Sequence, residues 1–387
     1  MNIDPKTLTG TWNYPTAMRF GPGRIGELAD ACESLAMTRP LLVTDPGLAA
    51  FDMVTAAVAA SGASLFSEIK GNPVGRNVED GVDAYQAGAC DGVIAFGGGS
   101  ALDAGKAIAL MVGQSRPIWD FEDREDWWTR VDEAAIAPII AVPTTAGTGS
   151  EVGRASVITD EDSHLKKIIF HPRMLPAIVI SDPELTLGLP RHITAWTGMD
   201  ALAHCLEAYC APGFHPMADG IALEGMRLVK DWLPIAVADG ANLAARAHML
   251  VAATMGATAF QKGLGAIHAL SHPIGAVHDK HHGLTNAVVM PYVLDFNRPA
   301  IEGRLTALAR YLDLPDPSFE AVKRWVLDLR SELKIEHTLA ELGIGEQHVD
   351  ELTPMAAIDP SCGGNPIPVG EDELRGMFLA AIRGELA

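Results

Sequence analysis

Short runs of β-branched residues alternate with helix-like stretches through the first half of the chain. LLVT (41–44) precedes a stretch of helical character over 47–61, and GVIAF (92–96) precedes another. PIIAVP (138–143) and AIVIS (177–181) continue the series. Strands separated by helices predict a parallel α/β sheet, whose ligands collect at the carboxyl ends of the strands.

The alternation stops near Leu189-Pro190, and long helical patterns with few β-branched runs follow. We therefore expect an α/β domain over residues 1–190 and an all-helical domain over residues 191–387. A chain of 387 residues is long enough for two domains. Its 48% hydrophobic and 20% charged residues are typical of a globular enzyme.

Charge and cysteine content exclude several classes of protein. The net charge of −20 argues against nucleic acid or an anionic membrane as a partner, since both require a basic face. No apolar run is long enough to span a bilayer. The five cysteines form no CxxC pair, so we expect a reduced cytoplasmic protein without a disulfide framework. They are Cys32, Cys90, Cys205, Cys210 and Cys362.

Two loops rich in glycine and hydroxyl groups follow predicted strands. Gly97-Gly98-Gly99-Ser100 follows GVIAF and opens a helix, where backbone N–H groups and the helix dipole attract an anion. Thr144 to Glu151, TTAGTGSE, follows the next strand. Neither loop is a GxGxxG fingerprint, and each alone also describes an ordinary turn. Two such loops at successive strand ends favour a phosphate-bearing ligand.

Histidines gather in the second half, between Phe260 and Gly283. His268 and His272 stand four residues apart and would share one face of a helix. Upstream, Asp200 and His204 have the same spacing. Such pairs can bind one cation or take part in catalysis. The alternative is a structural role, with the aspartate as a buried helix cap and the histidines in the core or on the surface.

Four motifs identify a family resemblance. GGGSALDAGKAIA, PTTAGTGSE, TGMDALAHCLEAY and GLGAIHALSHPIGAVHDKHHG occur in this order and resemble those of the iron-containing (group III) alcohol dehydrogenases. The similarity extends over nearly the whole chain. It implies an α/β dinucleotide-binding domain with a parallel sheet, an all-α metal-binding domain and a homodimer.

The resemblance also implies the metal site. Its ligands would be Asp200, His204, His268 and His282. One oxygen and three imidazoles suit Fe2+ or Zn2+, which would act as a Lewis acid on an alcohol or aldehyde oxygen. His272 would move protons beside the metal, as an imidazole can near neutral pH. His278 and His281 do not match ligand positions.

The cofactor implied by the resemblance is NAD, with NADP the less favoured form. Asp45 ends the strand LLVT, where an acid accepts the ribose hydroxyls and repels a 2′-phosphate. A helix or turn cap beside Pro46 is the alternative role of this residue. The expected cofactor contacts are Asp45, Asn72, Gly98, Gly99, Ser100, Asp103, Thr144, Thr145, Thr148 and Lys166.

Two cations differ from the usual family pattern. Arg154 and Lys262 replace small or neutral residues, which suggests a substrate with a carboxylate, sulfonate or phosphonate group. An ordinary ion pair with an acid is the alternative for both. Phe260 and Cys362 are candidate walls of the substrate pocket. The tryptophan-rich stretch 119–135 is expected to leave the sheet as a loop.

The predicted function is therefore hydride transfer between NAD(H) and a small alcohol or aldehyde. Polyol or hydroxy-acid dehydrogenases of the same superfamily are the alternative. Sugar-phosphate cyclases would need more phosphate-binding Lys and Arg residues than this chain offers. A non-catalytic binding protein with the same fold would not need the complete set of metal-ligand candidates and His272.

Overall fold

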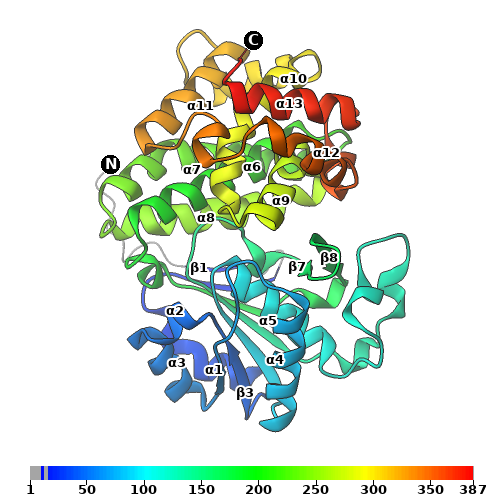
Figure 1. Ribbon diagram of the computed structural model, residues 1–387. Coiled ribbons are helices and arrows are strands. Elements are labelled where there is room, and N and C mark those ends of the chain that lie inside the picture. Colours follow the sequence, from blue (N-terminus) through cyan, green and yellow to red (C-terminus); the bar gives the residue numbers. More distant parts are fainter. Residues whose placement is uncertain (1–9, 13–15, 387) are drawn as a thin grey trace. The chain divides into compact units, whose positions relative to one another are not determined.

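The computed structural model describes residues 10–12 and 16–386. The chain divides into two compact units, Met1–Gly188 and Leu189–Ala387. The first is an α/β unit and the second is helical in the part that the structure describes (Figure 1). This confirms the predicted fold class.

Unit 1 is built on a seven-stranded sheet with the order β1-β2-β9-β6-β5-β3-β4. Its strands are β1 (Gly10–Trp12), β2 (Ala17–Phe20), β3 (Pro40–Val43), β4 (Ser64–Phe66), β5 (Gly92–Gly97), β6 (Ile139–Pro143) and β9 (Ile178–Ser181). All neighbours pair in parallel except β1, which pairs antiparallel with β2 at one edge. The predicted strands at β3, β5, β6 and β9 are present.

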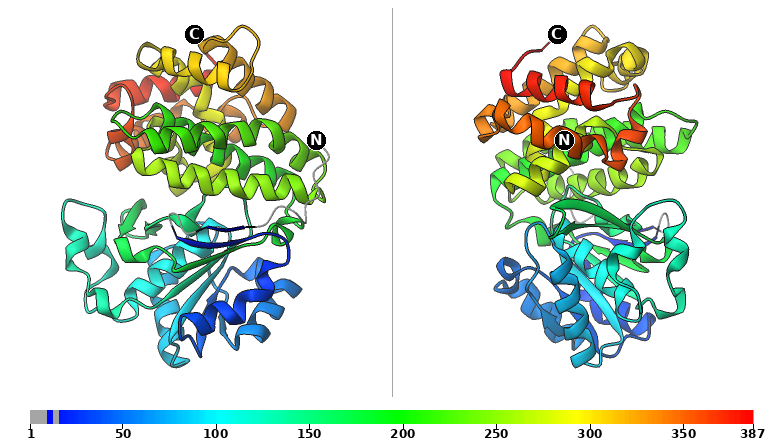
Figure 2. Two further views of the ribbon diagram at one scale, coloured as in Figure 1. Left: turned by 180° about the vertical axis from the view of Figure 1, so that it is seen from behind. Right: turned by 45° about the vertical axis from the view of Figure 1, so that its right-hand side comes forward.

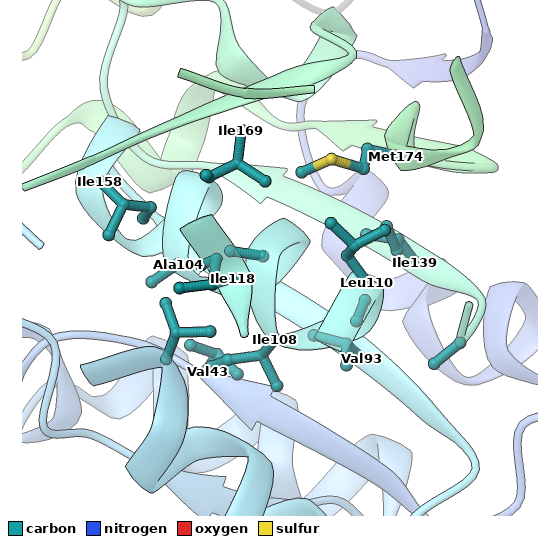
Figure 3. Packing of buried hydrophobic residues seen from close by; sticks show 14 of the residues in the cluster. Val43, Val93, Ala104, Ile108, Leu110, Ile118, Ile139, Ile158, Ile169 and Met174 are labelled. Carbon is teal, nitrogen blue, oxygen red and sulfur yellow. The ribbon is translucent and has the colours of Figure 1, made fainter. Parts of the chain in front are cut away.

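Helices cover both faces of this sheet. On one face, Val43 and Val93 pack with Ala104 and Ile108 of α5 (Gly99–Met111), beside α4 (Gly75–Ala87) (Figure 3). On the other face, Leu42 packs with residues of α1 (Leu28–Ser34) and α3 (Asp52–Ser61). Every residue of β3, β5, β6 and β9 is buried, as expected for a parallel sheet covered on both sides.

The single helical stretch expected over 47–61 is wrong in one respect. It consists of α2 (Pro46–Ala49) and α3, because Phe51 has an extended backbone and is the N-cap of α3. The stretch 119–135 leaves the sheet as short 3-10 turns, as predicted. An additional antiparallel hairpin, β7 (Ala155–Asp160) and β8 (Leu165–Phe170), follows the threonine-rich loop.

Unit 2 is a helical bundle around α6. Its helices are α6 (Arg191–Cys210), α7 (Pro216–Ala238), α8 (Leu243–Ala259), α9 (Ala266–His278), α10 (His282–Tyr311), α11 (Phe319–Leu333), α12 (Val349–Ala357) and α13 (Glu371–Arg383). Helix α6 packs against α7, α8 and α10, and α9 packs against α10 and α12. The green helices α6 to α8 lie side by side (Figure 2). Among the described residues, no helix is both long and apolar enough to cross a membrane.

Candidate metal and cofactor sites

Three helices of unit 2 supply the candidate metal ligands. Asp200 and His204 lie one turn apart on α6, and both are buried. His268 lies in the first turn of α9, and His282 is the first residue of α10. We call these residues, Asp200, His204, His268 and His282, the four-ligand cluster.

The ligand atoms of the four-ligand cluster converge. One nitrogen or oxygen from each residue lies within 4.8 Å of the others. Asp200 Oδ1 is 3.9 Å from His204 Nε2 and 3.6 Å from His282 Nε2. One carboxylate oxygen and three imidazole nitrogens are donors that iron and zinc accept. The arrangement therefore fits a single divalent ion.

The amide of Asn286 marks the same point of convergence. Its Nδ2 lies 2.8 Å from Asp200 Oδ1, 3.3 Å from His268 Nε2 and 3.1 Å from His282 Nε2. The amide donates to Asp200, and the Nε2 atoms of the two histidines lie around the same nitrogen. The carboxylate and the two imidazoles are thus oriented toward one place.

Close packing of α10 on α6 brings His282 to the cluster. A Cβ atom on Gly283 would lie 2.2 Å from the carbonyl oxygen of Trp196 and 3.0 Å from Asp200 Cβ. Only glycine permits this approach. The glycine after the histidine therefore serves helix packing at the cluster.

Buried side chains contact the Nδ1 atoms of two histidines of the four-ligand cluster, on the side of each ring away from the other ligands. His268 Nδ1 lies 2.5 Å from Glu207 Oε2, and His282 Nδ1 lies 3.1 Å from Ser271 Oγ. Such partners orient metal-binding imidazoles, and the Glu207 carboxylate, which can only accept, keeps Nε2 of His268 free. Burial disfavours the charged imidazole of His268, but Glu207 and Asp200 outweigh burial and raise its pKa.

His272 lies beside the four-ligand cluster. Its ring stacks on that of His282, with centroids 5.1 Å apart, and its Nδ1 lies 2.7 Å from Asp359 Oδ2. Burial alone would raise the pKa of Asp359, but His272 and the hydrogen bonds from Ser361 lower it. The aspartate therefore stays ionised, and it accepts the Nδ1 proton of His272.

The other two histidines of the stretch have different neighbours. The ring of His278 contacts that of His348, with centroids 4.5 Å apart, and burial lowers its pKa. His281 is the N-cap of α10, and its ring lies 5.1 Å from that of Trp196. Neither residue belongs to the four-ligand cluster.

The candidate pocket residues of unit 2 differ in their surroundings. The ring of Phe260 lies 5.0 Å from that of His204, so it borders the four-ligand cluster. The Cys362 thiol donates to the carbonyl of Ala356, and burial raises its pKa to about 12. Lys262 Nζ lies 2.6 Å from Asp219 Oδ1, and its side chain is 2% exposed.

Lys262 therefore forms an ordinary ion pair with an acid, which was the alternative to recognition of an anionic substrate. Its ammonium group also donates to the carbonyl oxygen of Tyr209, and Arg304 reaches the second oxygen of Asp219 at 3.3 Å. Arg154 of unit 1 is exposed; its guanidinium lies 5.6 Å from the Phe170 ring centre, and its charge favours the ionised form of Asp123.

The predicted cofactor loops of unit 1 meet at the ends of β5 and β6. Gly97 has a φ of 147°, which only glycine adopts readily, and its carbonyl accepts from Thr144 N at 3.0 Å. A Cβ on Gly99 would lie 2.5 Å from Thr148 Cγ2, and one on Gly98 would lie 3.2 Å from Thr145 Cγ2. The two threonines therefore face the glycine backbone directly.

Asp45, Ser100 and Asn72 adjoin these loops. Asp45 caps α2 by accepting from Leu48 N at 3.0 Å, which is the capping role named as the alternative. Its Oδ2 would lie 3.8 Å from a Cβ on Gly97, so the carboxylate also borders the glycine turn. The Ser100 hydroxyl donates to the carbonyl of Gly71, next to Asn72.

The remaining two cofactor candidates have structural neighbours. Asp103 accepts from Ser150 Oγ at 2.5 Å and from Val157 N at 3.0 Å, and Lys106 Nζ lies 3.3 Å away. Both carboxylate oxygens thus tie α5 to the threonine loop and β7. Lys166 of β8 pairs with Thr159, whose N–H donates to the carbonyl of Pro73.

Sequence reasoning missed three residues with buried side chains around the candidate metal site. Glu207 lies seven residues after Asp200 and three after His204, so its helical spacing was a readable signal. Asn286 follows His282 by four residues on α10. Asp359 carries no local signal, because it reaches His272 from a segment 87 residues away.

Two family profiles match the chain. The profile described as iron-containing alcohol dehydrogenase matches residues 15–183. The profile described as Fe-containing alcohol dehydrogenase family, C-terminal, matches residues 194–382. Together they extend over both units.

Named relatives agree with these matches. A 4-hydroxybutyrate dehydrogenase of Cupriavidus necator is 39% identical over 378 residues, which cover 94% of this chain and 98% of that protein. The crystal structure of a 1,3-propanediol oxidoreductase has a TM-score of 0.89 and 33% identity, and covers 94% of this chain and 97% of its own. A sulfoacetaldehyde reductase from Bifidobacterium kashiwanohense, solved with NAD+, has a TM-score of 0.86, 30% identity and coverages of 98% and 99%. The chain belongs to the iron-containing alcohol dehydrogenase family and is an oxidoreductase that interconverts alcohols and aldehydes.

Proposed function

We propose that the protein is a metal-dependent enzyme that uses NAD(H) to interconvert a small primary alcohol and its aldehyde. The proposal rests mainly on the four-ligand cluster, whose ligand atoms lie within 4.8 Å of one another. Asp200, His204, His268 and His282 would hold one Fe2+ or Zn2+. The bound ion would supply a Lewis acid for the substrate oxygen.

His272 is the residue we propose for proton transfer. Asp359 accepts its Nδ1 proton, so Nε2 is the nitrogen that can take or give a proton. The ring stacks on that of a proposed metal ligand, His282, which keeps it within reach of a group held there. General acid–base catalysis requires a proton carrier of this kind beside the reacting oxygen.

NAD rather than NADP is the proposed cofactor. Asp45 places a carboxylate beside Gly97, at the glycine turn where β5 ends. A carboxylate accepts hydrogen bonds from the two ribose hydroxyls and repels a 2′-phosphate. The NAD+ complex of the sulfoacetaldehyde reductase is consistent with this proposal.

For the substrate we propose a short alcohol whose far end carries a carboxylate or sulfonate. The relatives named for 4-hydroxybutyrate and sulfoacetaldehyde support this class. In this chain Arg154 is the candidate for the anion, because it is exposed, whereas Lys262 is buried against Asp219. An alcohol with a carboxylate at its far end is a hydroxy acid, so this proposal includes a hydroxy-acid dehydrogenase. The alternative proposal is a polyol dehydrogenase.

Metal content and turnover together test the metal site. The protein is purified anaerobically and its metal is quantified beside a variant with His268→Ala. We expect that variant to lose both the ion and the activity. The matched control is His278→Ala on the same helix, outside the four-ligand cluster, which should keep both. Activity that survives His268→Ala would contradict the proposed mechanism.

Substrate and cofactor assays test the remaining parts. Initial rates are compared for NADH and NADPH with succinic semialdehyde, sulfoacetaldehyde and butanal, and for NAD+ and NADP+ with a polyol such as glycerol in the reverse direction. We expect NADH and an anionic aldehyde to give the highest kcat/KM. Equal turnover of butanal and succinic semialdehyde would exclude recognition of an anion, and a preference for glycerol would favour the polyol alternative.

We also propose a homodimer in the reducing cytoplasm. The dimer is supported by the family resemblance alone, and light scattering after gel filtration would test it. The compartment is supported by five cysteines that are all free.

A further inference from the structure

Both oxygens of the Glu207 carboxylate are engaged at the start of α9. Oε1 accepts from the backbone N–H of Ile267 at 2.7 Å, and Oε2 lies 2.5 Å from Nδ1 of His268. The residue is 7% exposed, so water does not compete for these bonds. Glu207 itself belongs to α6, which also carries two residues of the four-ligand cluster.

The hydrogen bond from Ile267 N to Glu207 Oε1 fixes the N-terminus of α9. The first N–H groups of a helix have no partner within the helix, and its positive end favours an anion. Glu207 serves Ile267, and Asn365 Oδ1 accepts from Ala266 N at 3.1 Å. The backbone that carries His268 is therefore anchored directly to α6.

The second bond fixes the imidazole. A carboxylate can only accept, so Nδ1 of His268 must carry the proton. Nε2 then keeps its lone pair, and it lies 3.3 Å from the Asn286 amide at the centre of the four-ligand cluster. Rotation of the ring or a change of tautomer would break the bond to Glu207.

We propose that Glu207 is a positioning residue for the metal: it holds α9 in place and keeps His268 in the tautomer that can bind an ion. This inference rests on the proposed metal site. A neutral amide cannot replace the carboxylate in both tasks. In Glu207→Gln, the single acceptor oxygen can serve either Ile267 or His268, and an N–H group facing His268 would favour the wrong tautomer.

A matched carboxylate from another segment contacts α9 one helical turn further along, at His272. Asp359 is also buried, and it accepts from Nδ1 of His272, which is outside the four-ligand cluster. Asp359→Asn therefore removes the same kind of bond from the same helix without breaking a hydrogen bond to a proposed ligand, since Asp359 acts on His268 only through its charge. It separates an effect on the metal from a general loosening of α9.

The test measures Zn2+ affinity by competition with a chromogenic chelator, without any assay of turnover. We expect Glu207→Gln to bind Zn2+ about 10–100-fold more weakly than the unmodified protein, while Asp359→Asn binds it as tightly. With Co2+ as the probe, the visible absorption bands should shift in Glu207→Gln and stay unchanged in Asp359→Asn.

Two outcomes overturn the inference: unchanged Zn2+ affinity in Glu207→Gln, or an equal loss in both variants. If Glu207→Gln does not fold, the same competition is run on Glu207→Asp. Its shorter carboxylate cannot reach both partners, so this variant should also bind Zn2+ more weakly than the unmodified protein. Unchanged Zn2+ affinity in Glu207→Asp would likewise overturn the inference. An unmodified protein that binds no Zn2+, Co2+ or Fe2+ would instead refute the proposed function.

Discussion

Lys262 Nζ lies 2.6 Å from the carboxylate of Asp219, and the lysine side chain is almost wholly buried. A cation that sequence alone would offer to an anionic substrate is thus neutralised within unit 2. The pair belongs to a small network, because Arg304 contacts the same carboxylate.

Replacement of Lys262 should therefore change stability rather than specificity. We expect Lys262→Met to lower the free energy of unfolding by about 1–3 kcal/mol, because Asp219 and the Tyr209 carbonyl lose a buried donor. The ratio of kcat/KM for succinic semialdehyde to that for butanal should not change. Lys230→Met, at a more exposed lysine, is the control for stability. A large fall in the ratio would mean that Lys262 does contact the substrate.

Asp45 has two tasks that different substitutions separate. Asp45→Asn keeps a good N-cap on α2 but removes the charge, so kcat/KM for NADPH relative to NADH should rise about tenfold or more. Asp45→Ala should show the same change and also lose about 1 kcal/mol of stability with the cap. Steady-state kinetics and urea unfolding measure the two effects. A cofactor ratio unaffected by Asp45→Asn would leave the residue with the capping role alone.

Gly283 controls the approach of α10 to α6. The methyl group of Gly283→Ala would meet the Trp196 carbonyl at 2.2 Å, so we expect a loss of about 1–3 kcal/mol and weaker metal retention. Gly303→Ala on the same helix has open space around its Cβ and should be neutral or stabilising by up to about 1 kcal/mol. Thermal unfolding and metal analysis of the two variants check this. Equal stability and metal content of the two variants would show that α10 can move away from α6 without loss of stability.

Most thiols should resist alkylation in the folded protein. Burial raises the pKa of Cys32 to about 11 and those of Cys205, Cys210 and Cys362 to about 12. At pH 8 these groups are protonated and unreactive, and the thiolate fraction grows only as pH approaches those values. Iodoacetamide labelling followed by peptide mass spectrometry should therefore be slow until the protein is denatured. Fast labelling of Cys205 or Cys210 in the native protein would contradict their burial.

Asp103 should prove structural in unit 1. Asp103→Ala removes the bonds to Ser150 and Val157 and leaves Lys106 buried without its acid, which should cost about 3–5 kcal/mol. Burial already lowers the pKa of Lys106, so without Asp103 the lysine would lose its proton more readily, with only the carbonyls of Ser150 and Ala155 and the charge of Glu151 left to favour the ammonium form. Adding Lys106→Met to Asp103→Ala should recover part of the loss in urea unfolding. A stable Asp103→Ala variant with weak NADH binding would instead favour direct contact with the cofactor.

Local sequence was a good guide to unit 1. The strands at β3, β5, β6 and β9 were predictable because each is a short apolar run in a buried parallel sheet. Strand β4 and the hairpin of β7 and β8 were not predicted, because their exposed or mixed residues lack such a run. The break between α2 and α3 was also missed, since Phe51 carries no helix-stop signal.

The four residues proposed as ligands could be named from sequence because helical spacing and a family resemblance both bear on them. Asp200 and His204 share a face of α6 by their four-residue spacing alone. The convergence of these two with His268 and His282 needed the packing of α6, α9 and α10. No local pattern specifies how three helices approach.

The sequence by itself determined the α/β and helical halves, the glycine loops at the strand ends and the types of side chain available for a metal. Tertiary structure decided which charges are free and which are engaged. Lys262 is neutralised by Asp219 from α7, and His268 and His272 are oriented by Glu207 and Asp359 from distant segments. The physical reason is that hydrogen bonds and ion pairs depend on distances of about 3 Å between side chains. Such distances are set by helix packing across tens of residues.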